Sequence, residues 1–279
     1  MSAAKSSSYV QMKEIPLESK SKVTIERRGA VVLIGINRPY IQNRIDPETF
    51  QALAKAYYDY DLDESLRAAV LFGHGPNFSR GIDVDGFQSL VSSGAPLLGT
   101  TGVIDPLAKA APQRTKPVVV VVHGDTWNMG HEIHLAADVR VASAETNYGQ
   151  DENIHGRFPG GGGTIRFVRE AGWGNAMRYM LTGDHWSAEE AYRMGVVQQV
   201  APDPTSALEA GVNIASKIAA CGPLSIKTTL SSAHLVIDPI EHEALSQLEQ
   251  QYSVLYRTKD FVEGRNAEAE KRTPDYEGR

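Results

Sequence analysis

Short apolar runs alternate with amphipathic stretches over the first two thirds of the chain. Val23, Ile25 and Val31–Ile36 have the pattern of two strands joined by a turn at Arg27–Gly29. Three further apolar runs predict strands: Ala69–Phe72, Pro117–Val122 and Val139–Ala142. The five consecutive valines of the middle run are typical of a strand that is covered on both faces. Strands that alternate with helices predict an α/β domain with crossover connections.

Helix starts are marked by capping residues that precede apolar positions three and four apart. Asp46-Pro47-Glu48 places a cap, a proline and an acid in one first turn. Ser187–Glu190 and Ser206–Glu209 each have the spacing of a capping box, and Gly130–Asp138 predicts a short helix. Gly222-Pro223 is typical of a helix stop. An apolar stripe predicts one more helix near the end of the chain, at Leu245, Leu248, Tyr252 and Leu255.

The segments between these elements indicate how the chain is organised. Gly124–Met129 and the Gly-rich stretch Gly149–Thr164 show no periodicity and are predicted to be loops. The polar residues 1–20 predict a flexible N-terminal tail. We expect residues 21–205 to form the α/β core and residues 206–279 to form a helical C-terminal region.

Composition excludes several classes of protein. Lys and Arg number 28 against 34 for Asp and Glu, which gives a net charge of −6, whereas binding to nucleic acid or to a membrane surface needs a basic face. The longest aliphatic run, Val118–Val122, is too short to cross a bilayer. Cys221 is the only cysteine, so no intramolecular disulfide forms. The Ser-rich residues 1–8 lead into no apolar segment of the signal-peptide type. We expect a cytoplasmic protein with no nucleic-acid or membrane partner.

Common catalytic motifs are missing from the sequence. It contains no Gly-x-Ser-x-Gly nucleophile elbow and no Gly-Lys-Ser/Thr phosphate loop, and no Gly-rich stretch fits the dinucleotide-binding fingerprint. The run His131-Glu132-Ile133-His134 is one residue short of the His-Glu-x-x-His zinc motif, and no third ligand is evident. We therefore predict no metal site.

Two loops have features of an acid/base site. Phe78–Asp83 follows a predicted strand, and Trp127–Glu132 opens a predicted helix, so the main-chain N–H groups of both are available to hold a developing oxyanion. Glu132 near the helix start and Glu152 in the next long loop are candidates for paired acid and base. Taken separately, each glutamate has an ordinary explanation, because a first-turn carboxylate usually compensates the helix dipole and a loop glutamate is usually solvated.

Seven groups of motifs follow one another in a fixed order along the chain. They are Asn37–Pro39; Phe78–Asp83; Val122–Gly124 with Gly130–Glu132 and Ala136–Asp138; Tyr148–Gln150; Pro159–Thr164; Leu181–Gly183 with Ser187–Ala191; and Arg257–Gly264. In this order they resemble the crotonase (enoyl-CoA hydratase/isomerase) superfamily, from about Val23 to Arg279.

This resemblance implies an α/β fold built as a spiral of ββα units, with a helical C-terminal region that forms trimers, often paired into hexamers. It also implies an acyl-CoA thioester substrate. By motif position, the main-chain N–H groups that hold the thioester oxygen fall on Ile82 and Met129. The two hydratase glutamates fall on Glu132, which takes a proton from water attacking the β-carbon, and Glu152, which protonates the α-carbon.

Several positions depart from the family pattern. Asn128 and Met129 replace two glycines, and Asp85 stands where some hydratases place a lysine near the CoA phosphates. The basic residues available in place of that lysine are Arg38, Arg44, Arg80 and Lys271 of a neighbouring subunit. His131, His134 and Arg157 beside the two acids are also unusual. The residues predicted to contact substrate are Arg44, Arg80, Gly81, Asp83, Trp127, Gly130, His131 and Arg157.

The presence of both acids favours a hydratase that acts on a 2-enoyl-CoA. The alternatives are an isomerase, which needs Glu152 alone, and a divergent member that acts on another acyl-CoA or β-oxo compound. A further alternative is a non-catalytic relative that keeps the trimer and binds acyl-CoA or a protein partner. No separate cofactor is expected, because acid, base and oxyanion donors suffice and coenzyme A arrives as part of the substrate.

Overall fold

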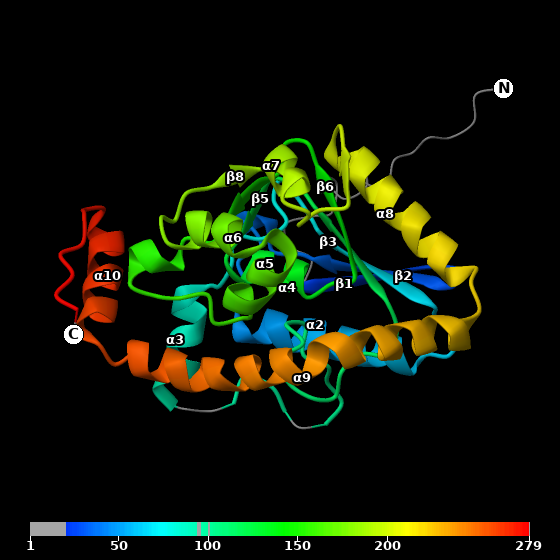
Figure 1. Cartoon of the computed structure of the whole chain (residues 1–279), viewed down its shortest axis with the longest axis horizontal. Coiled ribbons are helices and arrows are strands. Elements are labelled where there is room, and N and C mark those ends of the chain that lie inside the picture. The colour runs from blue at the N-terminus through cyan, green and yellow to red at the C-terminus, as the bar shows by residue number, and fades with distance from the viewer. Residues whose placement is uncertain (1–20, 94–95, 100, 279) are drawn as a thin grey trace.

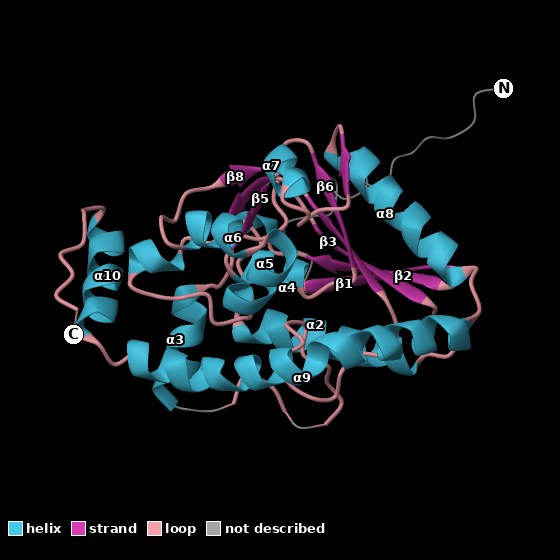
Figure 2. Ribbon diagram, viewed as in Figure 1, coloured by secondary structure: helices cyan, strands magenta, loops and turns pink. Residues whose placement is uncertain are grey.

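A six-stranded sheet lies at the centre of the molecule (Figure 2). The computed structural model describes residues 21–93, 96–99 and 101–278, so the predicted tail at 1–20 lies outside the described residues. The strand order is β1-β2-β3-β4-β6-β9; β1 and β2 are antiparallel and the other neighbours are parallel. The strands are β1 (Val23–Arg28), β2 (Val31–Ile36), β3 (Ala68–Gly73), β4 (Val118–Val122), β6 (Val139–Ser143) and β9 (Gln199–Ala201).

The valine strand β4 is buried on both faces, as predicted. Its odd and even positions belong to two different core clusters, since Val118, Val120 and Val122 pack on one side and Val119 and Val121 on the other. Helix α8 (Pro204–Ala219) covers the second side. A Cβ at Gly211 of α8 would lie 2.2 Å from a methyl group of Val121, so glycine permits the close approach of helix and sheet.

The opposite face of the sheet packs against several helices. Among those that contribute to the larger core cluster are α2 (Pro47–Leu62), α4 (Met129–Leu135) and α5 (Gly163–Ala171). Helix α2 begins as its sequence predicts, because Asp46 caps it and accepts a hydrogen bond from the N–H of Thr49 at 2.8 Å. The remaining helices of this part are η1 (Pro39–Ile41), α3 (Val84–Ser93), η2 (Glu152–His155), α6 (Trp173–Met180) and α7 (Ala188–Arg193), with Ser187 capping α7 as predicted.

A second, three-stranded sheet corrects the prediction of two loops. Its strands are β5 (Asp125–Trp127), β7 (Asn147–Gly149) and β8 (Trp186–Ser187). The stretch 124–129 is therefore largely a strand, and the stretch 149–164 contains η2 and the start of α5. Strands this short carry no periodicity of their own and form because they pair with distant segments. Parallel bridges Ile45–Ile82 and Ser79–Thr126 extend the same pairing, so the segments after β2, β3, β4 and β6 lie side by side.

The C-terminal part is helical, as predicted. Helix α9 (Pro223–Leu255) runs along one side of the molecule, and α10 (Lys259–Glu270) lies at its far end beside the C-terminus (Figure 1). Gly222-Pro223 separates α8 from α9, as expected for a helix stop. One cap is corrected: α8 begins one turn earlier than Ser206, because Asp203 is the cap and accepts a hydrogen bond from the N–H of Ser206.

Candidate functional site

Glu132 lies in the first turn of α4, and its carboxyl group is buried. Its Oε1 accepts hydrogen bonds from the main-chain N–H of Gly161 (2.7 Å) and of Gly163 (3.0 Å). A Cβ at residue 161 would lie only 2.3 Å from Glu132 Oε2, so the approach needs glycine. Burial raises the pKa of Glu132, but both N–H donors oppose the rise because they stabilise the carboxylate.

Glu152 lies at the start of η2 and is also buried. The side-chain amide of Gln150 donates to both of its carboxyl oxygens, at 2.9 and 3.1 Å. Burial, and then the nearby charge of Glu132, raise the pKa of Glu152 well above its usual range. The structure therefore brings the two predicted glutamates together, close enough for the charge of one to oppose ionisation of the other.

The two carboxyl groups have different surroundings, and we therefore expect them to have different pKa values. Glu132 receives two main-chain N–H bonds, whereas Glu152 is held by a neutral side chain and repelled by Glu132. Glu132 consequently ionises first, and Glu152 keeps its proton to higher pH. Such a pair supplies one base and one acid at the same place.

The loops of Ile82 and Met129 touch one another. Ile45 fixes the first loop, since its N–H donates to Gly81 O and its carbonyl accepts from Asp83 N, both at 2.8 Å. Gly81 has a φ of +83°, and a Cβ there would lie 3.5 Å from the main-chain nitrogen of Met129. Within the described part of the chain, the N–H groups of Ile82 and Met129 donate to no other group. Two unpaired donors are therefore close together.

Two predicted contact residues, Arg80 and Arg44, support these loops. The guanidinium of Arg80 donates to Asp125 at 2.6 Å and lies over the ring of Trp127, 4.4 Å from its centre. Arg44 donates one long hydrogen bond, 3.4 Å, to the carbonyl of Ile82. Trp127, itself a predicted contact residue, is thus covered by Arg80.

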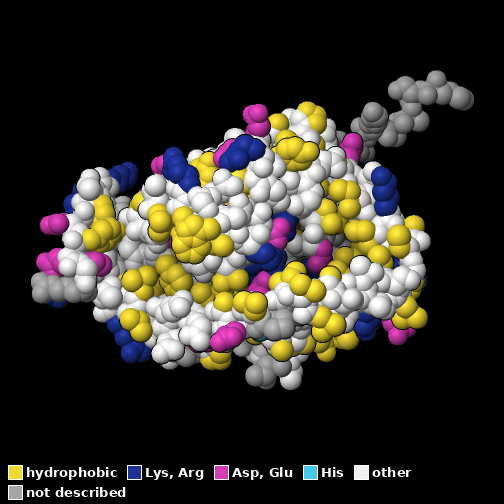
Figure 3. Space-filling model, in the orientation of Figure 1, with side chains coloured by type: hydrophobic (Ala, Val, Ile, Leu, Met, Phe, Trp, Pro, Cys, Tyr) yellow, Lys and Arg dark blue, Asp and Glu magenta, His cyan; other side chains and the backbone are white. Residues whose placement is uncertain are grey.

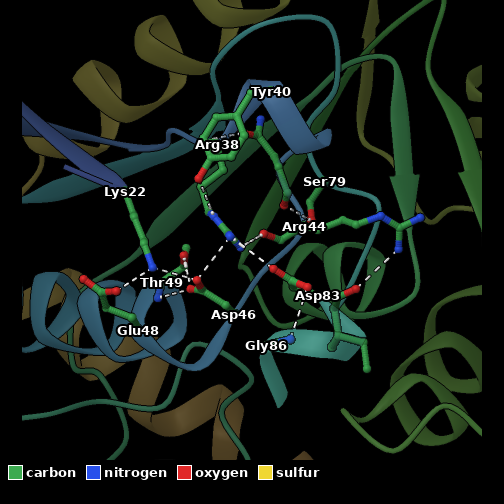
Figure 4. A network of polar contacts seen from close by, with 12 residues as sticks. Lys22, Arg38, Tyr40, Arg44, Asp46, Glu48, Thr49, Ser79, Asp83 and Gly86 are labelled. Carbon is green, nitrogen blue, oxygen red and sulfur yellow. Dashed lines mark hydrogen bonds and ion pairs between the residues drawn. The ribbon is translucent and has the colours of Figure 1, made fainter. Parts of the chain in front are cut away.

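A charged network holds the segment that precedes α3 (Figure 4). Arg38 lies between the carboxylates of Asp46 (3.2 Å) and Asp83 (3.1 Å), and Lys22 pairs with Asp46 (2.7 Å) and Glu48. The side chain of Arg38 is only 7% exposed, so its charge is already neutralised inside the protein. Asp83, a predicted contact residue, is fixed by Arg38 and is therefore part of the loop support.

His131 and Gly130 are predicted contact residues that the structure places in the interior. The ring of His131 is fully buried, and its Nδ1 lies 2.5 Å from Gln150 Oε1. Burial lowers the pKa of His131 to about 4. A Cβ at Gly130 would lie 2.7 Å from the carbonyl of Ser79, so this glycine allows the two loops to pack. The aromatic rings around His131 are those of Tyr148, Phe167 and Trp186.

Arg157, the last predicted contact residue, connects the acid loop to the C-terminal helix. Its side chain is 8% exposed and donates to Glu268 of α10 at 3.3 Å. Helix α10 approaches η2 closely, since a Cβ at Gly264 would lie 2.3 Å from the carbonyl of His155. Arg157 thus lies behind the acid loop, at its contact with α10.

The C-terminal end of helix α9 carries two aromatic residues, Tyr252 and the C-cap Tyr256, to which the sequence pattern assigns no chemical role. Tyr252 and Tyr256 share a hydrogen bond between their hydroxyl groups. Both are half-buried, and burial raises their pKa values, with the nearby charges of Glu132 and Glu152 adding to the rise. Gly160 packs against the ring of Tyr252. The spacing of Tyr252 predicted its helix, but nothing in that pattern predicts contact with a distant acid.

A separate cavity of about 570 Å³ lies between α9 and the core. Figure 3 shows side chains of both charges gathered in a hollow above α9. None of the predicted site residues lines this cavity. Three ion pairs lie along it: Arg114–Asp138, Arg140–Glu170 and Arg166–Glu241. The last of these joins α9, which carries Glu241, to α5 in the core.

The described residues hold neither a cluster of metal ligands nor a membrane-spanning helix. No group of three or more His, Cys, Asp and Glu side chains is arranged to hold a metal ion among residues 21–93, 96–99 and 101–278. In the same part of the chain, none of the helices has the length and apolar character needed to cross a membrane.

Comparison with known proteins gives consistent matches over nearly the whole chain. Residues 26–279 match the profile of the enoyl-CoA hydratase/isomerase family. An enoyl-CoA hydratase of Mycobacterium tuberculosis is 32% identical over 266 residues, which are 94% of this chain and 99% of that protein. A probable enoyl-CoA hydratase/isomerase from Mycobacterium abscessus has a similar crystal structure, with a TM-score of 0.76, 38% identity, and coverage of 93% of this chain and 99% of the other. The crystal structure of a carnitinyl-CoA hydratase from Mycobacterium avium is also similar, with a TM-score of 0.82 and 28% identity. That match covers 92% of this chain and 99% of the other.

Proposed function

This chain belongs to the enoyl-CoA hydratase/isomerase family, the crotonase superfamily, and from that premise we propose that it is a lyase that adds water across the double bond of a 2-enoyl-CoA thioester. One observation carries the proposal: the carboxyl groups of Glu132 and Glu152 are both buried, and they lie close enough for the charge of Glu132 to raise the pKa of Glu152. Hydration needs a base for water and an acid for the α-carbon, and this pair supplies both.

Each step uses one of these groups. Glu132 accepts a proton from water, whose oxygen forms the new bond to the β-carbon. The electron pair of the double bond moves toward the thioester and gives an enolate, and Glu152 donates its proton to the α-carbon. One proton has entered at Glu132 and one has left at Glu152, so a proton passing from Glu132 to Glu152 restores the starting state.

The enolate oxygen is assigned to the main-chain N–H groups of Ile82 and Met129. The contact of the two loops at Gly81 and the absence of other acceptors for these donors within the described residues support this assignment. Donors that are fixed before the reaction stabilise the developing charge without reorganisation, and loss of one costs about 3 kcal/mol of transition-state stabilisation.

Coenzyme A enters this site as part of the substrate, and we propose that no separate cofactor takes part. Arg44 is the best placed of the predicted basic contacts, because it lies beside the Ile82 loop and makes a single long hydrogen bond to the described residues through its guanidinium. Arg80 and Arg38 have carboxylate partners. Gly81 and Trp127 are the other proposed substrate contacts, whereas Asp83, Gly130 and Arg157 support the surrounding loops.

For the assembly we propose a homotrimer, or a hexamer of two trimers, built on a spiral of ββα units. The pairing of successive loop segments beside one another supports the spiral. Helix α9 supports the trimer, because its large apolar side chains, between 75% and 82% exposed, need a covering surface. These side chains are Leu224, Leu235, Val236 and Ile240. A cytoplasmic location stays a prediction from the sequence.

Spectrophotometry with crotonyl-CoA tests the proposed reaction, because hydration removes the conjugated enoyl absorbance. We expect the wild type to consume this signal and Glu132→Gln to lower the rate about 10²–10⁴-fold, the usual contribution of a general base. Glu189→Gln, an exposed glutamate of α7, is the matched control and should behave as the wild type. Undiminished hydration by the Glu132 variant would overturn the assignment. A wild type that only interconverts 3-enoyl and 2-enoyl thioesters would identify an isomerase.

A further inference from the structure

Residue 128 has a backbone conformation that normally requires glycine. Asn128 joins β5 to α4 with φ +52° and ψ −122°, the geometry of the first central position of a type II′ turn. A side chain is strained there, and such strain persists only where the surroundings enforce it. Asn128 directly precedes Met129, so the peptide that carries the Met129 N–H is oriented by the ψ angle of residue 128.

The surroundings enforce this conformation through Asp151. Asn128 Nδ2 donates to Asp151 Oδ1 at 2.7 Å, and the N–H of Asp151 donates back to Asn128 Oδ1 at 2.9 Å. The N–H of Asn128 donates to the carbonyl of Gly149, also at 2.9 Å. Three hydrogen bonds therefore connect the segment before one oxyanion donor to the segment before the catalytic acid Glu152.

Asp151 is suited to accept these bonds as a carboxylate. It is 8% exposed, and its second oxygen lies 3.3 Å from His185 Nε2 and 3.8 Å from His155 Nε2. Burial alone raises the pKa of Asp151, but the contacts with His155, His185 and Asn128 outweigh burial and hold that pKa well below its usual range. The acceptor thus stays charged across the ordinary pH range.

We propose that Asn128 and Asp151 are positioning residues that hold the Met129 N–H toward the thioester oxygen, an inference that rests on the proposed function. Asn128 also contacts the other loop, since a Cβ at Gly81 would lie 2.9 Å from the Cβ of Asn128. One side chain therefore packs against the loop of the first donor and orients the second. By binding the side chain of Asn128, Asp151 offsets the backbone strain of a non-glycine residue at this position.

Three variants test this proposal by rescue: Asp151→Ala, Asn128→Gly and the two combined. We expect D151A to lower kcat on the order of 10–100-fold with little change in KM, because a displaced donor loses less than a deleted one. N128G should cost only about threefold, since glycine adopts the required backbone angles unaided. The double variant should match N128G and exceed D151A in kcat, because glycine no longer needs Asp151. Asp59→Ala, an exposed aspartate of α2, is the control.

A second measurement reports the donor directly. The absorption of a bound 2,4-dienoyl-CoA moves to longer wavelength when hydrogen bonds polarise its thioester carbonyl. We expect this shift with the wild type, a smaller shift with D151A and a restored shift with the double variant. A double variant as slow as D151A, or a full shift with D151A alone, would overturn the proposal. If D151A fails to fold, the double variant is compared with N128G instead. Equal kcat and an equal spectral shift support the proposal, and a lower kcat with a smaller shift overturns it. A wild type with neither hydration nor a shift would instead reject the proposed function.

Discussion

The carboxyl groups of Glu132 and Glu152, which we propose to be the catalytic base and acid, are both buried but are held by different parts of the chain. Glu132 is bound by main-chain N–H groups of the segment that leads into α5, whereas Glu152 is bound by the side chain of Gln150. Gln150 is in turn fixed by His131, whose ring lies in the aromatic core. The base therefore depends on backbone geometry, and the acid depends on a chain of side chains.

This difference accounts for the opposite roles that we propose for two identical groups. Main-chain donors are fixed by the fold and stabilise an ionised carboxylate, which suits a base. A side-chain amide is neutral, and the charge of Glu132 adds to burial in keeping Glu152 protonated, which suits an acid. Changes to the backbone of one region and to the side chains of the other should consequently act on different steps.

Among changes to the residues that hold the two carboxyl groups, Gly161→Ala is expected to have the largest effect. The new methyl group would lie 2.3 Å from Glu132 Oε2, so the carboxyl group must move away from its two N–H donors. We expect kcat for crotonyl-CoA hydration to fall about 10²–10³-fold, within the range that general bases contribute. Gly174→Ala is the matched control, because nothing lies within 4 Å of the added Cβ on the exposed face of α6.

The two glycine variants also separate catalysis from folding. Circular dichroism and a thermal melt should show G161A folded, because the added methyl group meets a side chain rather than the backbone. Wild-type kcat in G161A would show that the base works without the observed position. A large loss in G174A would show that the assay reports stability instead.

The architecture was largely predictable where local pattern and tertiary structure agree. The valine run of β4 and the Asp46 cap of α2 are strong local signals, and both are confirmed. Strands β5 and β7 were not predicted, because each has three residues and exists through pairing with the other. Sequence periodicity reflects only the local conformation of the chain, so it cannot predict pairing between distant segments.

The site was predictable in its acids and only partly in its supports. The resemblance located Glu132 and Glu152, and the structure brings them together. Gly161 lies in a stretch that the sequence predicts to be a loop, and no pattern there predicts that its main-chain N–H donates to Glu132. The sequence pattern identifies Tyr252 only as part of a helix, because its electrostatic interaction with the two acids joins segments that are far apart in the sequence. Contacts of this kind arise from the folded arrangement and leave no local pattern.

A smaller effect, on stability, is expected from Glu152→Gln. Because the pKa of Glu152 is raised in the folded state, the folded protein keeps a proton that the unfolded chain releases above its ordinary pKa of 4.5. Stability therefore falls as pH rises from 4.5 toward the raised pKa. Glutamine has no proton to lose, so E152Q should unfold less readily at pH 8, by about 1.4 kcal/mol for each unit of the shift.

Urea unfolding at pH 4 and pH 8 measures this difference. The gain of E152Q over the wild type should be present at pH 8 and absent at pH 4, while its hydration activity is lost at both. The exposed Glu189→Gln should show no gain at either pH. Equal stabilities of E152Q and wild type at pH 8 would mean that the fold tolerates the ionised acid without cost.

The smallest effect is expected from His131, which acts on Glu152 only through Gln150. His131 Nδ1 donates to Gln150 Oε1, so the amide nitrogen of Gln150 faces the carboxyl group and favours its ionised form. Without that donor the amide can rotate, and the pKa of Glu152 should rise further. His131 Nε2 has no partner among the described residues, so His131→Phe loses one hydrogen bond and keeps its aromatic neighbours.

The pH profile of kcat/KM tests this side-chain connection. In His131→Phe, we expect the basic limb, where the acid loses its proton, to move to higher pH, with a change of only a few-fold in rate at neutral pH. His131→Asn is the control, because its amide nitrogen lies close to the position of Nδ1 and can donate to Gln150. The Asn variant should keep the wild-type profile. If both variants moved the limb equally, the effect would come from packing, and the dependence of the acid on side chains would be refuted.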